Sequence, residues 1–492
     1  MSSSKSKHPS GLYVLFFSEM WERFSFYGMR ALLVLYMVKA FGFNDSDAYA
    51  VYGAYGALVY ASPVIGGMLA DRIMGARLAV ILGGVLMSLG HFTMAVETPG
   101  FLYFALALIC AGNGFFKANI SSMVGKLYKE NDPLRDSGFT IFYMGINIGA
   151  FTASVLCGYV GQTFGWHYGF GMAGVGMIIG LITFIRGQKY LGNHGLPPNP
   201  KALKQKLFGN LVSREKLIYL GTALAVPVIA LGLYRNEAVG WALNLTAIAI
   251  LGYLLFVAFS SGKVARDRLI LVMLLMIFHT TFWAFFEQAG SSLTLFADRN
   301  VDRSIFGWEM PASMAQAFNP FFIIALGPVF VWLWGKLAAL KKTPSIPIKF
   351  AYGIFGVGLG FYALVFGSQF AGPDAQTGLI FLVLAYFLHT AGELFISPIG
   401  LSAVTKLSPA KVVSTVMGAW FLSISFAHHI AALIAKLTGV KGSGDTSGEI
   451  DASQSLGVYV DVFGDIFTAS AVIGIILVLI SPLLKKLAHG VR

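Results

Sequence analysis

The stretch that decides the fold is EMWERFSFYGMR, residues 19–30, because it sets charged side chains in an otherwise apolar segment. At about 100° per residue, Glu19, Glu22, Arg23 and Arg30 project from one helical stripe. A charged group inside a bilayer costs roughly 2.5–3.5 kcal/mol, so such a stripe needs a polar cavity or opposite charges beside it. Glu19 alone could instead reach interfacial water. The stretch therefore predicts a membrane helix with a functional polar face.

Three more charged residues lie deep in apolar segments. Lys117 belongs to the first half of the chain, and Glu287 and Glu393 are the only deep acids of the second half. A lone buried lysine loses its proton, whereas nearby acids keep it charged, in a static ion pair or in a proton-coupled site. Because opposite charges divide between the halves, we expect salt bridges between the halves that form and break in turn.

The composition indicates an integral membrane protein. The chain of 492 residues is 56% hydrophobic and only 12% charged, with a mean hydropathy of +0.72, whereas soluble proteins carry about 25% charged residues. Apolar runs long enough to cross a core about 30 Å thick recur from end to end. They predict an all-α protein with fourteen membrane helices, at 11–38, 51–70, 78–96, 101–124, 137–160, 167–186, 216–236, 241–260, 268–296, 318–338, 348–370, 378–405, 411–436 and 459–484.

The net charge of +12 reflects membrane topology rather than nucleic-acid binding. With the N-terminus inside, 26 of the 35 Lys and Arg residues fall on the inner side, 6 on the outer side and 3 in the membrane. The positive-inside rule then places both termini in the cytoplasm. We expect a multi-pass protein of the cell (inner) membrane, with the lipid bilayer and not nucleic acid as its partner.

The chain divides around one basic, proline-containing connection. We predict a six-helix bundle at 1–186, a cytoplasmic linker at 187–215 that is partly helical at 201–212, an inserted helix pair at 216–262, and a second six-helix bundle at 263–492. The inserted pair carries few polar residues, so we place it outside the functional core. Two six-helix halves are typical of secondary carriers, whose site lies at the midplane between them.

The cysteines and histidines give little indication of a function. Cys110 and Cys157 both fall in helices, so we expect apolar fillers, with no disulfide, metal site or cofactor. Four histidines also lie in predicted helices, as structural groups or as a proton relay. They are His279, His389, His428 and His429.

The segment GGMLADRIMGAR, residues 66–77, resembles the signature loop between helices 2 and 3 of the major facilitator superfamily. We expect it in the cytoplasmic loop. There Asp71, Arg72 and Arg77 would latch helix ends by charge and hydrogen bonds, a conformational role.

A more specific resemblance covers nearly the whole chain. E-x-x-E-R at 19–23 looks like a motif of the proton-dependent oligopeptide transporter family. FYMGINIG at 142–149 and GELFISPIGLS at 392–402 resemble two further signatures of that family. Bacterial members also carry the extra helix pair. The resemblance implies the major facilitator fold and import of di- and tripeptides with protons as the coupling ion.

By motif match, the resemblance also assigns roles to residues. Glu19, Glu22 and Arg23 would serve proton coupling, and the gate salt bridges would be Arg30–Glu287 and Lys117–Glu393. The peptide carboxylate would meet Arg30, Lys117 and Asn147, and the amine Glu393 and Asn319, with Ser397 in the same motif as Glu393. Aromatic side chains would wall the pockets for the peptide's side chains: Tyr27, Tyr60, Trp283 and Trp420.

Two departures and several alternatives remain. Phe26 stands where some bacterial members have tyrosine, and Gly53 lies about where eukaryotic members have a histidine, so proton coupling must use carboxylates. Two alternative interpretations are a related carrier for another small solute such as nitrate and a peptide-sensing receptor. We expect no enzyme, because no nucleophile–base pair stands out, and we expect a monomer.

Overall fold

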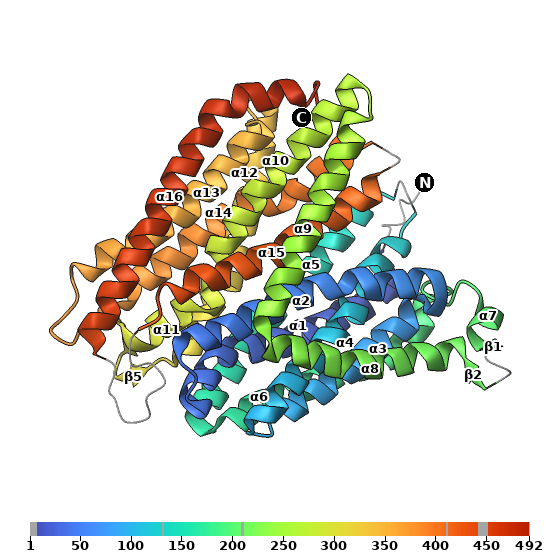
Figure 1. The fold of residues 1–492 in the computed structure, drawn as a ribbon, viewed down its shortest axis with the longest axis horizontal. Coiled ribbons are helices and arrows are strands. Elements are labelled where there is room, and N and C mark those ends of the chain that lie inside the picture. The colour runs from blue at the N-terminus through green and yellow to red at the C-terminus, as the bar shows by residue number, and fades with distance from the viewer. Residues whose placement is uncertain (1–6, 130–131, 208–210, 410–411, 441–450, 492) are drawn as a thin grey trace. The chain divides into compact units, whose positions relative to one another are not determined.

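The computed structural model describes residues 7–129, 132–207, 211–409, 412–440 and 451–491. These residues are almost entirely helical, and they include 14 helices long and apolar enough to cross a membrane (Figure 1). The all-α expectation and the number of spans are confirmed. The helices that begin before residue 200 are α1 Ser10–Phe41, α2 Asp45–Leu69, α3 Gly75–Met94, α4 Pro99–Lys126, α5 Arg135–Phe164 and α6 Trp166–Gly187.

The described residues from 200 onward add ten more helices and six short strands. The helices are α7 Pro200–Lys204, α8 Arg214–Tyr234, α9 Asn236–Phe259, α10 Lys263–Phe286, α11 Ser292–Arg299, α12 Phe318–Ala339, α13 Ile346–Ser368, α14 Leu379–Leu407, α15 Val413–Lys436 and α16 Ala452–Leu487. The strands are β1 Lys206–Leu207, β2 Val212–Ser213, β3 Val301–Asp302, β4 Ser304–Ile305, β5 Trp308–Glu309 and β6 Thr377–Gly378. They form antiparallel pairs β1–β2 and β4–β5 and a parallel pair β3–β6.

The helices group into two compact units. Unit 1 comprises residues 1–32 and 58–235, and unit 2 comprises residues 33–57 and 236–492. The boundaries run through α1 and α2, so the first part of α2 packs with the C-terminal helices. They also separate the two helices of the inserted pair, because α8 packs on α4 in unit 1 and α9 on α10 and α15 in unit 2. The four predicted domain ranges, drawn along the chain, stay predictions.

Unit 1 is built on close contacts of α3 with α4 and α6, and of α5 with α6. Small residues allow the close approach that membrane helices need. A Cβ on Gly66 of α2 would collide with the carbonyl oxygen of Gly114 on α4. This contact fixes α2 against α4 next to Lys117.

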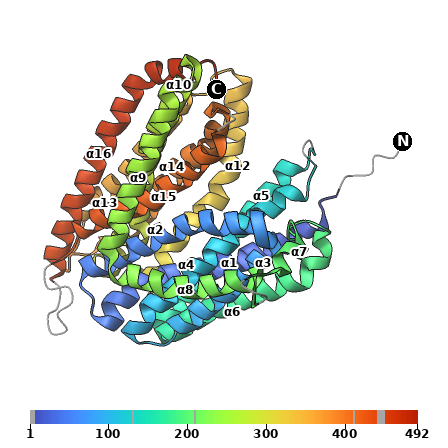
Figure 2. The same ribbon diagram turned by 45° about the vertical axis from the view of Figure 1, so that its right-hand side comes forward.

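Unit 2 is built on α13, which packs on both α14 and α16 (Figure 2). α2 joins this unit through its glycines. A Cβ on Gly53 would collide with Ala432 of α15, and one on Gly56 would lie 2.5 Å from the His428 ring. Glycine at these positions therefore lets α2 lie directly against α15.

The structure adds local detail to three expectations. The expected helix over 268–296 breaks at 287–290, a 3₁₀ turn, where the Thr294 hydroxyl donates to the carbonyl of Ala289. The linker helix stops at Lys204 instead of 212, because Gln205 leaves the helical region and the chain turns into β1.

The third detail concerns the segment 66–77, which is not an irregular loop. α2 runs through a π-helical turn, Ala70–Met74, and ends at Gly75, whose φ of +78° favours glycine. Arg77, in the first turn of α3, donates from Nε to the His194 carbonyl at 2.7 Å. Arg77 therefore holds the linker, while Asp71 and Arg72 are exposed.

Candidate functional site

The acids and the arginine of E-x-x-E-R form one buried cluster on α1. Glu19, Glu22 and Arg23 are each at most 3% exposed. The Arg23 Nε lies 3.2 Å from Glu19 Oε1 and also donates to Glu22. Two carboxylates therefore share one guanidinium, as the helical stripe predicted. Their proton-coupling role stays a prediction.

Two side chains of α4 complete this cluster within unit 1. The Asn113 amide donates to Glu22 Oε1 at 3.4 Å. The Lys117 ammonium acts electrostatically on the Glu19 carboxylate and lies 4.0 Å from the centre of the Tyr60 ring. With both acids ionised, the formal charges of Glu19, Glu22, Arg23 and Lys117 cancel. Asn113 was not anticipated, although it lies one helical turn before Lys117.

The cluster is incompletely bonded. Glu19 Oε2, Arg23 Nη2 and Asn113 Oδ1 are buried and have no hydrogen-bond partner among the residues that the structure describes. An unmade hydrogen bond on a buried charged group is costly. The cluster can therefore gain partners when a proton arrives or when its side chains move.

Two other predicted ligands of the carboxylate side also lie in unit 1. The Arg30 guanidinium lies over the Tyr27 ring, 5.6 Å from its centre. Asn147 on α5 is buried, and its amide donates to the Tyr143 carbonyl at 3.0 Å. Arg30 and Tyr27 are therefore neighbours, whereas the Asn147 amide hydrogen bonds within its own helix.

The predicted amine site is assembled within unit 2. Asn319 of α12 donates to Glu393 Oε2 at 2.9 Å and to Thr390 Oγ1 at 3.1 Å. Glu393 is 8% exposed. Ser397, one turn further along α14, has a buried hydroxyl without a hydrogen-bond partner among the described residues. The spacing of these residues in the sequence did not predict that Thr390 would join them.

The two predicted tryptophans of the pocket wall meet through a histidine. Trp283 Nε1 donates to His279 Nε2 at 2.9 Å, and His279 Nδ1 lies 2.9 Å from the Ser423 hydroxyl. The Trp420 ring packs on His279 at 4.2 Å between centres. One imidazole nitrogen accepts a hydrogen bond and the other lies within hydrogen-bond distance of a hydroxyl, as expected for a neutral ring. This arrangement supports a structural role for His279 rather than a role in a proton relay.

Glu287 begins the 3₁₀ turn that follows α10. It is 2% exposed, and its Oε1 lies 3.8 Å from His428 Nε2 on α15. His428 is thus the histidine beside a buried acid, and it packs against α2 at Gly56. Arg30 and Lys117 belong to unit 1, and Glu287 and Glu393 to unit 2, so both gate pairs stay predictions.

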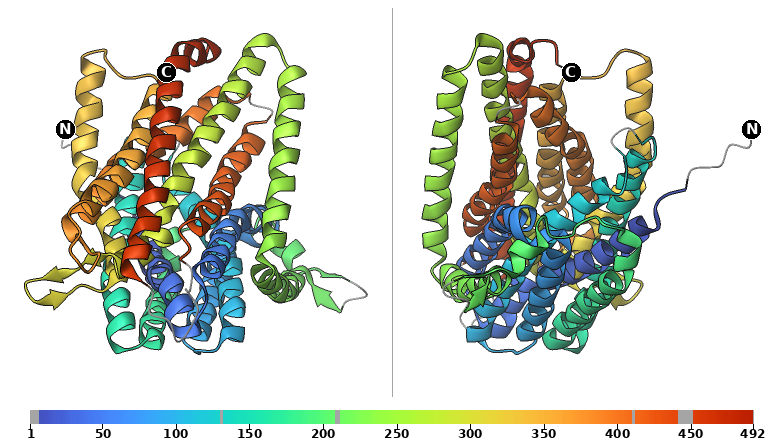
Figure 3. Two further views of the ribbon diagram at one scale, coloured as in Figure 1. Left: turned by 60° about the vertical axis from the view of Figure 1, so that its left-hand side comes forward. Right: turned by 90° about the vertical axis from the view of Figure 1, so that its right-hand side faces the viewer.

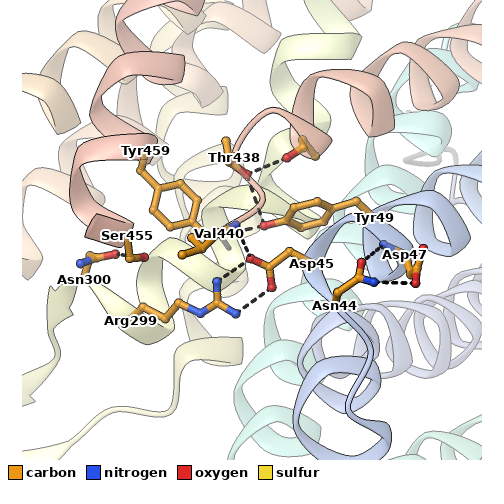
Figure 4. A network of polar contacts seen from close by, with 11 residues as sticks. Asn44, Asp45, Asp47, Tyr49, Arg299, Asn300, Thr438, Val440, Ser455 and Tyr459 are labelled. Atoms are coloured by element: carbon orange, nitrogen blue, oxygen red, sulfur yellow. Dashed lines mark hydrogen bonds and ion pairs between the residues drawn. The ribbon is translucent and has the colours of Figure 1, made fainter. Parts of the chain in front are cut away.

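A second buried ion pair lies within unit 2 and was missed from the sequence. Arg299, at the end of α11, donates from both terminal nitrogens to the Asp45 carboxylate, at 2.7 and 2.8 Å (Figure 4). The Val440 N–H donates to the same carboxylate at 3.2 Å. Tyr49 lies beside it, 3.4 Å from the hydroxyls of Tyr459 and Thr438.

This Asp45–Arg299 network ties the start of α2 to α11 and to the end of α15. Little in the sequence indicated this ion pair, because Asp45 has the position of an ordinary first residue of a helix and Arg299 is one of six basic residues expected on the outer side.

Metal-binding and disulfide chemistry find no support in the described residues. No group of three or more His, Cys, Asp or Glu side chains there is placed to hold a metal ion. Cys110 and Cys157 are buried free thiols.

A many-helix membrane protein with buried acids and bases in each of two units is, by class, a secondary carrier of small charged solutes.

Comparisons with known proteins narrow this class. The model of the POT family matches residues 77–449. The chain is 32% identical to dipeptide and tripeptide permease B of Xenorhabdus bovienii (strain SS-2004), over 97% of this chain and 96% of that protein. It is 38% identical to the uncharacterized transporter YclF of Bacillus subtilis (strain 168), over 98% and 96%.

Solved structures agree. A crystal structure of a mutant peptide transporter POT in complex with alafosfalin aligns with a TM-score of 0.83 at 37% identity, covering 98% of this chain and 96% of that one. A bacterial homologue of the human drug peptide transporters aligns with a TM-score of 0.83 at 31% identity, covering 97% and 99%.

The chain belongs to the POT family and has the major facilitator fold of these transporters. It is a multi-pass membrane protein, and in bacteria such proteins lie in the inner membrane.

Proposed function

We propose that this protein imports di- and tripeptides together with protons by alternating access. Peptide transport is supported by the permeases and peptide transporters that it resembles over nearly its whole length. The observation in the chain itself that carries the proposal is the pairing of a buried acid with an amide, Glu393 with Asn319, in one unit, and of a cation with an aromatic ring, Lys117 with Tyr60, in the other.

A short peptide presents one ammonium and one carboxylate, and these groups match the two sites. Glu393 would accept hydrogen bonds from the peptide amine, and Arg30 and Lys117 would pair with its carboxylate. A hydrogen bond to a charged group contributes about 1.5–3 kcal/mol, or about 10–150-fold in affinity. Recognition of both ends of the backbone explains tolerance of side chains together with strict limits on length.

Protons would act on the cluster of Glu19, Glu22 and Arg23. A proton on either acid leaves one carboxylate to pair with Arg23, and the formal charges of Glu19, Glu22, Arg23 and Lys117 then sum to +1 instead of zero. A ligand drives a conformational change only if it binds one state better than the other. Glu19 Oε2 and Arg23 Nη2 have no hydrogen-bond partner among the described residues, and they would supply that difference by gaining partners in a second arrangement.

The Asp45–Arg299 network would act as a latch on one side of the membrane. Under the predicted orientation it lies at the outer ends of α2 and α11. Release of α2 from α11 would break two charge-assisted hydrogen bonds, so this side would open only when binding elsewhere offsets that loss.

We further propose that one chain is the transport unit and that it has no enzymatic activity. The charged groups required for both ends of a peptide are present in a single polypeptide. Oligomers occur among its relatives, since one similar solved structure is described as tetrameric.

The test is uptake of labelled dialanine into proteoliposomes under an imposed pH gradient, acid outside. Wild type should accumulate the dipeptide only with the gradient, and Glu393→Gln and Lys117→Ala should abolish accumulation. The variant Asp374→Asn, at an exposed position with no assigned role, serves as an expression and insertion control. Uptake of nitrate that dialanine does not inhibit would favour the related carrier, and wild-type rates in both site variants would refute the assignment.

A further inference from the structure

The inserted helix α9 lines two cavities that adjoin end to end within unit 2. The first cavity is lined by residues 236–244 of α9, by residues 429–436 of α15 and by Ala50 and Ala54 of α2. The second is lined by residues 243–251 of α9, by α10 and by residues 419–430 of α15. α9, green in Figure 3, packs on both of these helices. Their linings follow one another along the same two helices, at residues 243 and 244 of α9 and at residues 429 and 430 of α15, and we call the two cavities together the α9 path.

The first cavity, of about 310 Å³, is mostly apolar but also carries charges of both signs. Glu237 and Lys436 both line it, and neither has an ion-pair partner among the residues that the structure describes. Asn236, Asn244 and His429 add hydrogen-bonding groups, and Trp241 stands at its edge. Tryptophan at the end of a membrane helix is typical of the interface with water.

The second cavity is a groove of about 220 Å³ that offers an apolar surface to a ligand. Its hydroxyl groups are already bonded to backbone carbonyls. Thr246 donates to Ala242 at 2.7 Å, Thr281 to Ile277 at 3.0 Å, Thr280 to Ser423 at 3.3 Å, and Ser423 to Trp420 at 2.6 Å. The rest of the lining is Leu, Ile, Met, Ala and Phe. The groove therefore offers hydrocarbon contact and no free polar group.

The dimensions fit a membrane lipid. From residue 243 to 251 a helix rises about 12 Å, close to the half-thickness of about 15 Å of a bilayer core. The first cavity lies at the end of α9 that follows the turn from α8, and the predicted topology places this turn at the outer surface of the membrane.

We propose that the α9 path binds one phospholipid with a zwitterionic headgroup of the ethanolamine type. Lys436 pairs with the phosphate, Glu237 with the ammonium, and one acyl chain lies in the groove between α9, α10 and α15. A headgroup that lacks an ammonium leaves Glu237 unpaired. The site therefore prefers phosphatidylethanolamine to phosphatidylglycerol with the same acyl chains. This inference is independent of the proposed transport function.

The experiment is native mass spectrometry of the full chain, purified in the lowest detergent concentration that keeps it soluble. The protein is titrated separately with phosphatidylethanolamine and with phosphatidylglycerol that carry the same acyl chains. Wild type should retain one phosphatidylethanolamine at least about tenfold more strongly than phosphatidylglycerol, a difference of about 1.4 kcal/mol. Glu237→Gln/Lys436→Gln should abolish this preference. Thr246→Trp, which fills the groove, should reduce retention of both lipids.

The matched control is Leu245→Trp, which adds the same side chain to an exposed position next to Thr246. It should retain lipid as wild type does, and an unchanged melting temperature should show that each variant is folded. Equal retention of both lipids by wild type would overturn the proposal, as would wild-type preference in the double variant. Displacement of the bound lipid by dialanine would also overturn the proposal and would identify the first cavity as a peptide subsite.

Discussion

Two buried ion clusters differ in how completely their charges are bonded. In the Asp45–Arg299 pair, both carboxylate oxygens accept from Arg299, and a backbone N–H adds a third bond. In the cluster on α1, two acids share Arg23, and atoms of Glu19 and Arg23 stay without a hydrogen bond among the described residues. Both clusters are almost fully shielded from solvent.

The difference separates a structural role from a functional one. A fully bonded buried pair contributes to holding one arrangement, and removing one partner is strongly destabilising. An incompletely bonded cluster is close in free energy to a second protonation or bonding state. We therefore expect the Asp45–Arg299 pair of unit 2 to stabilise one arrangement, and the cluster on α1 of unit 1 is the proposed site of change on protonation.

The largest effect on stability is expected for Asp45→Asn. It removes the charge that Arg299 binds with both terminal nitrogens, which costs about 3–5 kcal/mol for a buried pair. Chemical unfolding in detergent micelles measures this loss. Asp47→Asn, the same exchange at an exposed position two residues away, should stay within about 0.5 kcal/mol. Equal free energies of unfolding for the two variants would show that the Asp45–Arg299 pair does not hold this arrangement together.

Glu19→Gln should show the opposite profile. The amide keeps one acceptor for Arg23, and the other oxygen makes no hydrogen bond to lose, so stability should change by less than about 1 kcal/mol. Gradient-driven uptake should nevertheless fall more than about tenfold, or about 1.4 kcal/mol in the barrier. A variant that unfolds as readily as Asp45→Asn would show that both clusters serve stability.

Tyr60 sharpens the account of Lys117. The ammonium lies 4.0 Å over the ring, an interaction that contributes about 0.5–2 kcal/mol. Tyr60→Leu should therefore raise the KM for dialanine by about 2–30-fold. Tyr60→Phe keeps the ring and should stay near wild type. Equal KM values for the two variants would mean that the ring does not act on Lys117.

The smallest effect is expected for Tyr49→Phe. The hydroxyl lies 3.4 Å from both Tyr459 and Thr438, at the long end of hydrogen-bond distances. The loss should be at most about 1 kcal/mol in the same unfolding assay. A loss as large as that of Asp45→Asn would place the stability of the network in the tyrosines rather than in the ion pair.

Local pattern was sufficient for the helices and for the cluster on α1. Hydropathy gave the membrane spans because the bilayer demands continuous apolar helices. The i, i+4 spacing of Glu19 and Arg23 predicted their contact, which the structure confirms. The pairing of Asn319 with Glu393 came from the family motifs, and the structure also shows it.

What escaped prediction depends on contacts between distant segments. Asp45 and Arg299 are separated by 254 positions, so no helical period relates them. His428 lies 3.8 Å from Glu287, and glycine at position 56 leaves room for its ring, because a Cβ there would lie 2.5 Å from His428 Nδ1. The break after α10 and the early end of α7 depend on side-chain and turn geometry that hydropathy does not record.

The most direct measurement of the central claim compares two modes of dialanine transport by Glu22→Gln in proteoliposomes. Glu22 contacts both Arg23 and Asn113, so it lies at the centre of the proposed proton-coupling cluster. The account predicts that the variant exchanges dialanine in counterflow but no longer accumulates it under a pH gradient. Accumulation by the variant at the wild-type rate and extent would contradict the account.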